Sequence, residues 1–133
     1  MMLHTGGTVR LRSDHTWKKA AGLLGFALAA LGILILVSPA VAAPLFASGG
    51  VSESNATYIR AIAVRDIAVG LWLLVGPTIS VGATTIPLVM ICLIPLGDLA
   101  LIWSAKGDLL SLLPHILSLT CLIILVLWGS RVA

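Results

Sequence analysis

The predicted fold is all-α: a four-helix transmembrane bundle with antiparallel neighbours and both termini cytoplasmic. Of the 133 residues, 59% are hydrophobic and 10% are charged, whereas about a quarter of the residues in a soluble domain are charged. The hydrophobic residues also fall into four runs, each close to the roughly 20 residues that a helix needs to cross a bilayer. No run alternates apolar and polar residues with period two, so transmembrane β-strands are not expected.

These runs form a single predicted membrane domain. It covers residues 20–129 and follows a basic cytoplasmic tail over residues 1–19. The backbone N–H and C=O groups of a lipid-embedded segment find no water, so each run is expected to be helical. The expected helices cover about residues 20–38, 58–79, 84–105 and 109–129.

The first run, Ala20 to Val37, has an alternative interpretation. Basic residues, an apolar stretch and the triplet Ala40-Val41-Ala42 together resemble a signal peptide with its cleavage site. The apolar cores of signal peptides are usually only about 7 to 15 residues long. The greater length of this run favours a retained helix.

The basic residues indicate how the helices are oriented. Four of the eight precede the first run and Arg131 follows the last, whereas residues 38–57, between the first two runs, carry only Glu53 as a charged residue. Cytoplasmic flanks of membrane helices are typically basic, so both termini are expected in the cytoplasm. The net charge is +3, but the basic residues form no patch interleaved with aromatic residues. No nucleic-acid partner is therefore expected.

Aromatic residues mark the expected membrane boundaries. Trp17, Trp103 and Trp128 lie near the ends of predicted spans, and Tyr58 begins the second one. Tryptophan and tyrosine are enriched at this depth because their rings are amphipathic. Trp72 is the exception, since it falls in the middle of a span.

The segment before the second predicted helix contains a glycosylation sequon, Asn55-Ala56-Thr57. This sequence makes Asn55 a candidate acceptor for an N-linked glycan. Because the sequon adjoins the membrane, a chance occurrence is the alternative interpretation.

An Arg–Asp pair, Arg65 and Asp66, lies inside the second apolar stretch. A charge at such a depth costs roughly 2.5 to 3.5 kcal/mol on insertion scales, so ionisable residues there indicate a functional site. From the helical rise, the pair lies about 10 to 12 Å below the outer boundary, Asp98 of the third helix about 10 Å and His115 of the fourth about 9 Å. These four groups are therefore expected in one layer of the outer half of the membrane.

The rotation of these residues about their helices adds a second expectation. Arg65 and Asp66 are about 100° apart around the helix axis, so they are not expected to face the same point. One of the two is predicted to face Asp98 and His115. The other is predicted to face a neighbouring helix, the preceding loop or Arg60.

Further polar residues are candidates for binding a ligand beside this layer. Ser111 and Ser118 share the face of the fourth helix that carries the histidine, and Arg60 lies near the rim of the second helix. Pro95, three residues before the aspartate of the third helix, frees a backbone carbonyl in the preceding turn. This could widen the site locally.

Small residues predict where helices approach closely. Such residues let helices pack together in lipid. One row lies on the first predicted helix, and another shares the face of Asp66 on the second. The rows are Ala21, Gly25 and Ala29, and then Ala63 and Gly70.

Catalysis on a small lipophilic molecule is the first function that the polar layer suggests. An isomerisation, a cyclisation or a hydration would suit it. Asp98 or Asp66 would be the acid or base, and His115 would relay a proton because the unperturbed pKa of histidine lies near neutrality. Arg65 would hold a carboxylate or stabilise a developing negative charge.

A non-enzymatic accessory or structural protein is the second class of function. Buried ion pairs would then fix the helix packing. Arg65 would pair with Asp98, and Asp66 with His115 or Arg60. A third idea is passage of protons or solutes through a homo-oligomer, since four helices alone make an unlikely transporter.

Neither a metal nor a cofactor is expected. Asp66, Asp98 and His115 could offer mixed carboxylate and imidazole ligands. The nearby guanidinium of Arg65 disfavours a cation among them. The expected partners are membrane lipids, a small lipophilic molecule and further copies of the chain.

These residues, in this order and spacing, resemble a known family from about Gly22 onward. It is the small four-helix integral membrane family catalogued as domain of unknown function 4267, a neighbour of the DoxX-like proteins. The resemblance implies a four-helix membrane fold and transfers no activity. Ala63-Val64 depart from the family pattern, which has a glycine before the Arg–Asp pair. The matching residues are Pro39, Tyr58, Arg60, Arg65, Asp66, Gly70, Pro95, Gly97, Asp98, Gly107 and His115.

Overall fold

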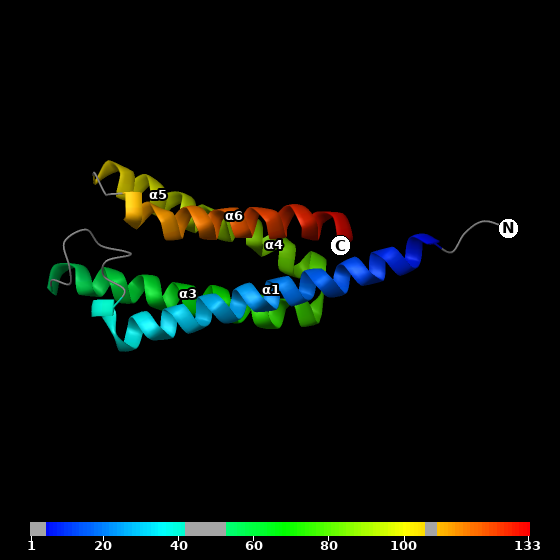
Figure 1. Ribbon diagram of the computed structural model, residues 1–133, viewed down its shortest axis with the longest axis horizontal. Coiled ribbons are helices and arrows are strands. Elements are labelled where there is room, and N and C mark those ends of the chain that lie inside the picture. The colour runs from blue at the N-terminus through cyan, green and yellow to red at the C-terminus, as the bar shows by residue number, and fades with distance from the viewer. Residues whose placement is uncertain (1–4, 42–52, 106–108) are drawn as a thin grey trace.

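The computed structural model describes residues 5–41, 53–105 and 109–133, with side chains described from Ser13 in the first helix and from Ala56 in the second. Every bounded element within these ranges is an α-helix, and no strand occurs in them (Figure 1). The helices are α1 (Thr5–Val37), α3 (Glu53–Ile79), α4 (Val81–Ile91), α5 (Leu93–Ser104) and α6 (Leu109–Val132).

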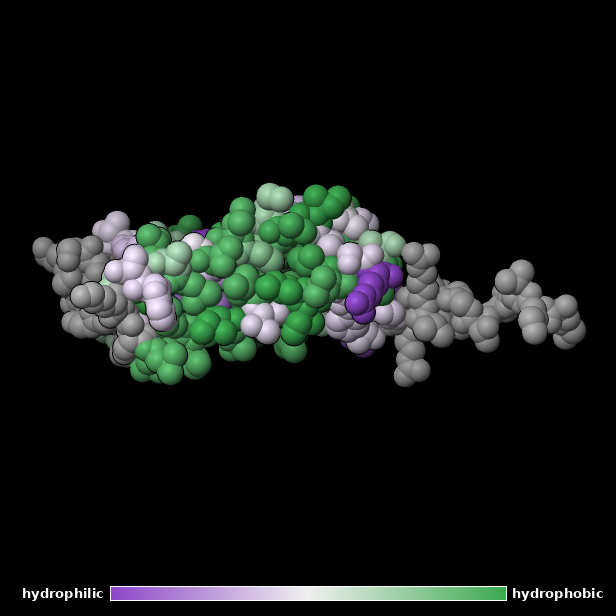
Figure 2. Space-filling model, turned by 90° about the horizontal axis from the view of Figure 1, so that it is seen from above, coloured by the Kyte–Doolittle hydropathy of each residue, from purple (hydrophilic) through white to green (hydrophobic). Residues whose placement is uncertain are grey.

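Within the described residues, four helical segments are long and apolar enough to cross a membrane. They cover Ser13–Val37, Ala56–Ile79, Val81–Ser104 and Leu109–Val132, and the third consists of α4 and α5 together. A broad hydrophobic surface covers the middle of the molecule and gives way to more polar surface toward its ends (Figure 2). The predicted all-helical, multi-pass membrane architecture is therefore confirmed.

Two helices begin earlier than their apolar runs. Helix α1 begins at Thr5, within the predicted basic tail, and α3 begins at Glu53. Lysine and arginine are good helix formers, so a helix continues past the lipid-facing stretch without difficulty. An ion pair one turn apart, Lys18 Nζ to Asp14 Oδ2 at 3.3 Å, lies in this polar part of α1.

A turn at Cys92 divides the third span into α4 and α5. The Cys92 N–H still donates to the carbonyl of Leu88 at 3.0 Å. Pro95 has no N–H, so the carbonyl of Ile91, four residues before it, lacks its helical donor. The loosened backbone that Pro95 predicts is thus found one turn before the proline.

Helices α1 and α3 pack most closely, through small residues. A Cβ atom on Gly25 would lie 2.7 Å from the carbonyl oxygen of Gly70, and one on Gly32 would lie 2.6 Å from that of Ala63. A Cβ on Gly70 would lie 2.6 Å from the backbone nitrogen of Ala29. Only residues without larger side chains allow this approach, as the rows of small residues predict.

The helices form two layers. Helices α1 and α3 make one layer, and α4, α5 and α6 make the other (Figure 1). Contacts of α1 with α6 and of α3 with α4 join the layers near the end that carries the C-terminus. A cluster of buried apolar residues fills this junction, namely Trp17, Ala21, Leu73, Val81, Leu88, Leu122 and Leu125.

Trp17 lies inside this junction. Its side chain is fully buried, and its Nε1 donates a hydrogen bond to the carbonyl of Leu125 at 2.8 Å. Trp17 still lies near the start of the candidate span Ser13–Val37, so its expected level at the membrane boundary stays a prediction. Helix α1 begins before its apolar run, so residues that precede the run also pack against the other helices.

Candidate functional site

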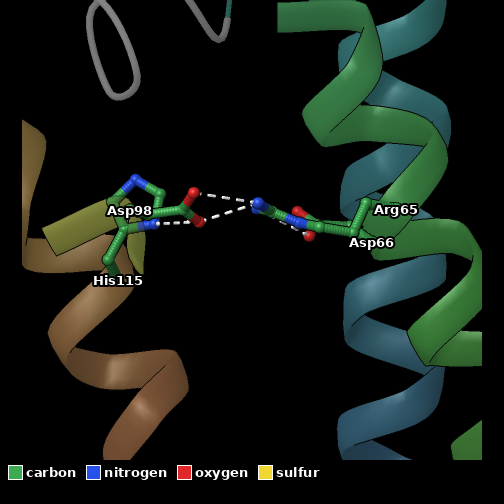
Figure 3. A network of polar contacts seen from close by, with 4 residues as sticks. All are labelled: Arg65, Asp66, Asp98 and His115. Atoms are coloured by element: carbon green, nitrogen blue, oxygen red, sulfur yellow. Dashed lines mark hydrogen bonds and ion pairs between the residues drawn. The ribbon is translucent and has the colours of Figure 1, made fainter. Parts of the chain in front are cut away.

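An ion pair connects the two layers in the half of the bundle away from the C-terminus. Arg65 extends from α3 toward Asp98 of α5 (Figure 3). Its Nη1 donates to Asp98 Oδ1 at 3.0 Å and lies 2.8 Å from Oδ2. Helices α3 and α5 are not among the closely packed pairs of the described chain. The charged side chains therefore span a region where the two backbones do not meet directly.

His115 of α6 completes the contact on the far side of the same carboxylate. Its Nδ1 lies 3.2 Å from Asp98 Oδ2. The side chains of His115 and Asp98 are only 4% and 9% exposed. In such surroundings charge interactions are stronger than in water. Asp98 thus lies between a guanidinium and an imidazole from two other helices.

Asp66 joins this group through Arg65. The Arg65 Nη2 donates to Asp66 Oδ1 at 3.4 Å. The expectation that Arg65 and Asp66 face different surroundings is wrong, because both line the same cavity. The long arginine side chain carries its guanidinium away from the direction set by its Cα, and so the angle of about 100° does not separate the two charges. The predicted pairing of Asp66 with His115 or Arg60 gives way to pairing with Arg65.

The four ionisable residues line a small cavity between the layers. Its volume is about 50 Å³. A cavity needs roughly 10 to 15 Å³ on this measure to hold one water molecule, so only a few non-hydrogen atoms fit. The rest of the lining is mostly apolar and comes from every membrane helix, namely Leu28, Leu31, Val69, Ile91, Ile94, Pro95, Pro114, Ser118 and Leu122.

The candidate binding residues divide into three groups. Ser118 lines the cavity. Ser111 is buried but does not line it, and Arg60 is exposed on α3 and lies outside it. The side chain of Asn55, the candidate glycan acceptor, lies outside the described residues.

The apolar wall of the cavity was not predicted. Leu28 and Leu31 bring α1 to the site, but in the sequence they are indistinguishable from the lipid-facing leucines around them. Pro114 carries a usable signal. It precedes His115 within α6 and removes the N–H that the carbonyl of residue 110 would accept. Two membrane helices thus have a proline beside their polar residue.

Metal ligation finds no support in the described part of the chain. No group of three or more His, Cys, Asp or Glu side chains there is arranged to hold an ion. The guanidinium between Asp66 and Asp98 also occupies the position that a cation would take.

A comparison with protein-family models gives a match. The model of a family described as "Domain of unknown function (DUF4267)" matches residues 25–129, which include all four residues of the charged group and the full lining of the cavity. Searches of curated proteins and of solved structures found no match.

Proposed function

Because the chain belongs to the DUF4267 family, whose function is unknown, we propose a function from the geometry of the site. The charged group between the layers binds the polar end of a small lipophilic molecule and exchanges a proton with it. An isomerisation, a cyclisation or a hydration is the class of reaction that such a site would serve. The observation that carries the proposal is the Asp98–His115 pair facing a cavity inside a membrane bundle.

The Asp98–His115 pair is suited to acid–base work. The carboxylate of Asp98 lies 3.2 Å from His115 Nδ1, and it would hold the ring in one orientation. Arg65 would in turn hold the carboxylate in place from the opposite side. In this proposal Asp98 and His115 are the catalytic residues, and Arg65 and Asp66 position them.

The charges favour a neutral ligand. Both Nη atoms of Arg65 already contact carboxylates, so the guanidinium is poorly placed to bind a carboxylate of the substrate. Two carboxylates also face one guanidinium, so these three side chains carry an excess of one negative charge. An anionic substrate would add to that excess in a medium that screens charge weakly. A hydroxyl or carbonyl compound therefore fits best.

The size of the cavity sets how such a molecule would bind. Pockets that enclose whole drug-sized ligands occupy roughly 300 to 1,000 Å³, and this cavity occupies about 50 Å³. Only the polar end of the ligand would lie inside. The remaining hydrocarbon would lie against the apolar wall and the surrounding lipid.

The proposed topology places this site in the outer half of the membrane. With antiparallel neighbours and both termini cytoplasmic, the basic residues of the α1 region and Arg131 lie inside, as the positive-inside rule requires. His115 lies near the start of α6 and so near the outer face. A ligand would then enter from the outer leaflet.

The test compares lipid extracts of cells that produce the wild-type protein, His115→Gln or His15→Gln. His15 is an exposed histidine on α1, so its variant is a matched control. With equal amounts of folded protein, at least one neutral lipophilic compound should change in abundance with the wild type and with His15→Gln. His115→Gln should leave the extract like that of cells without the protein. Identical extracts from all samples would overturn the catalytic proposal.

A second candidate function is a purely structural connection between the layers. The bridge from α3 to α5 favours it, because charged side chains there replace direct helix packing. In that case Asp98→Asn would lower the thermal stability in detergent, and no compound would depend on His115. Because the ion pair contributes to stability under either function, the lipid extracts separate the two functions.

A further inference from the structure

A second feature lies outside the charged site, on the lipid-facing surface between α1 and α6. It is an apolar groove of about 360 Å³. Its volume is within the range of pockets that hold whole small ligands. None of the described residues that line it is charged. Its walls include Leu23, Leu24 and Ala27 of α1 and Ile124, Leu125 and Trp128 of α6.

The walls of this groove are fixed to each other by two hydrogen bonds between α1 and α6. Trp128 Nε1 donates to Ser13 Oγ at 3.1 Å, and Trp17 Nε1 donates to the Leu125 carbonyl at 2.8 Å. The groove is therefore part of the packed structure and keeps its shape. Trp128 forms part of the groove wall near the end of α6, and tryptophan is typically enriched at the level of lipid headgroups.

Positive charge lies at this same end. Lys19 is one turn before Leu23 on α1, and Arg131 is about one turn after Trp128 on α6, so both continue the groove faces. Both side chains are exposed. Lys18 pairs with Asp14 at 3.3 Å, whereas Lys19 and Arg131 form no salt bridge with a described side chain. Figure 2 shows hydrophilic surface directly beside the hydrophobic region there.

We propose that this groove binds an anionic phospholipid. One acyl chain lies between α1 and α6, and the phosphate contacts Lys19 and Arg131. The lysine methylenes can follow the apolar wall while the ammonium reaches the phosphate. Basic clusters beside a membrane helix attract anionic lipids in this way. A second copy of the chain in the same orientation would instead bring its own basic end against this one, and like charges would repel.

The test measures the lipids that remain on the purified protein by native mass spectrometry, after addition of equal phosphatidylglycerol and phosphatidylcholine. The wild type should retain phosphatidylglycerol in preference. Lys19→Gln and Arg131→Gln should each weaken that binding about fivefold. Arg60→Gln, an exposed arginine on α3, is the charge control and should bind as the wild type does.

The acyl-chain part has its own variant. Ala27→Phe fills the groove without changing any charge, and Ala100→Phe places the same side chain on an exposed position of α5. Only the first should reduce lipid binding. Equal retention of both lipids would overturn the choice of headgroup, and binding that survives Ala27→Phe would overturn the choice of groove. If the wild type were a dimer and Ala27→Phe dissociated it, the occupant of the groove would be a second copy of the chain and not a lipid.

Discussion

The α1–α3 interface and the charged site between the layers hold helices together in different ways. At the interface, Gly25, Gly32 and Gly70 bring two backbones into direct contact. At the site, the backbones of α3 and α5 stay apart and Arg65 reaches Asp98 across the intervening space. The first arrangement leaves no room between the helices. The second leaves a cavity with polar groups in its wall.

This difference agrees with the proposal that the first region carries the fold and the second carries the chemistry. Close packing of small residues gains dispersion contacts and needs no polar partner. Charges inside a bundle cost free energy to bury and return it only when they are paired. A region that buries charges at this cost, and leaves space for a ligand, is better suited to binding that ligand than to stabilising the fold.

The largest effect is expected where the backbones touch. Gly25→Leu would place a side chain against the Gly70 carbonyl and the Leu73 side chain, with the first carbon only 2.7 and 2.8 Å away. Because backbone atoms cannot yield, α1 and α3 should separate at a cost of about 3 kcal/mol. Unfolding by SDS in detergent micelles measures it. Gly22→Leu is the control, because a Cβ atom on Gly22 would meet nothing within 4 Å. If both variants lost the same free energy of unfolding, close packing at Gly25 would not be the cause.

Asp98→Asn should have the next largest effect. Removing one partner of a buried ion pair typically costs about 3 to 5 kcal/mol. We expect a smaller loss of stability here, about 2 kcal/mol. Arg65 keeps Asp66 as a partner, and the side chain of Arg65 is 26% exposed. The same SDS titration applies.

The matched control for that variant is Asp14→Asn. Asp14 pairs with Lys18 in a more exposed setting, with side chains 31% and 38% exposed. Such surface pairs contribute at most about 1 kcal/mol. If both asparagine variants lost the same small amount, the bridge between α3 and α5 would contribute no more than a surface pair.

A smaller effect is expected at the junction of the layers. Trp17→Phe removes the hydrogen bond to the Leu125 carbonyl and should cost about 1 kcal/mol. Trp103→Phe is the control, because Trp103 is 77% exposed. A shift in thermal unfolding with Trp17→Phe alone would agree with a buried Trp17, and no shift would contradict it.

The sequence predicts the layer of the site better than its interior. A helix rises by the same amount at every residue, so counting residues along each span brought Arg65, Asp98 and His115 to one depth. Rotation was less informative, because a guanidinium lies several bonds away from the Cα that the helix positions. This is why Asp66 shares the cavity with Arg65 when the helical angle predicts separation.

Helix ends and the apolar wall lay beyond sequence reasoning for a different reason. Hydrophobicity reports which residues can face lipid, and it is the same for a leucine at the cavity and a leucine at the surface. Leu28 and Leu31 could therefore not be assigned to the site. The first helix was predicted to begin at residue 20 because the apolar run begins there, while the helix itself begins at Thr5.

The most direct test is a double-mutant cycle between Arg65 and Asp98. The free energy of unfolding in detergent is measured for the wild type, Arg65→Gln, Asp98→Asn and the double variant. If the two side chains bridge the layers, the double variant should lose less than the sum of the single losses, with a coupling of about 1 to 2 kcal/mol. Losses that add to within about 0.5 kcal/mol would contradict a bridge between α3 and α5.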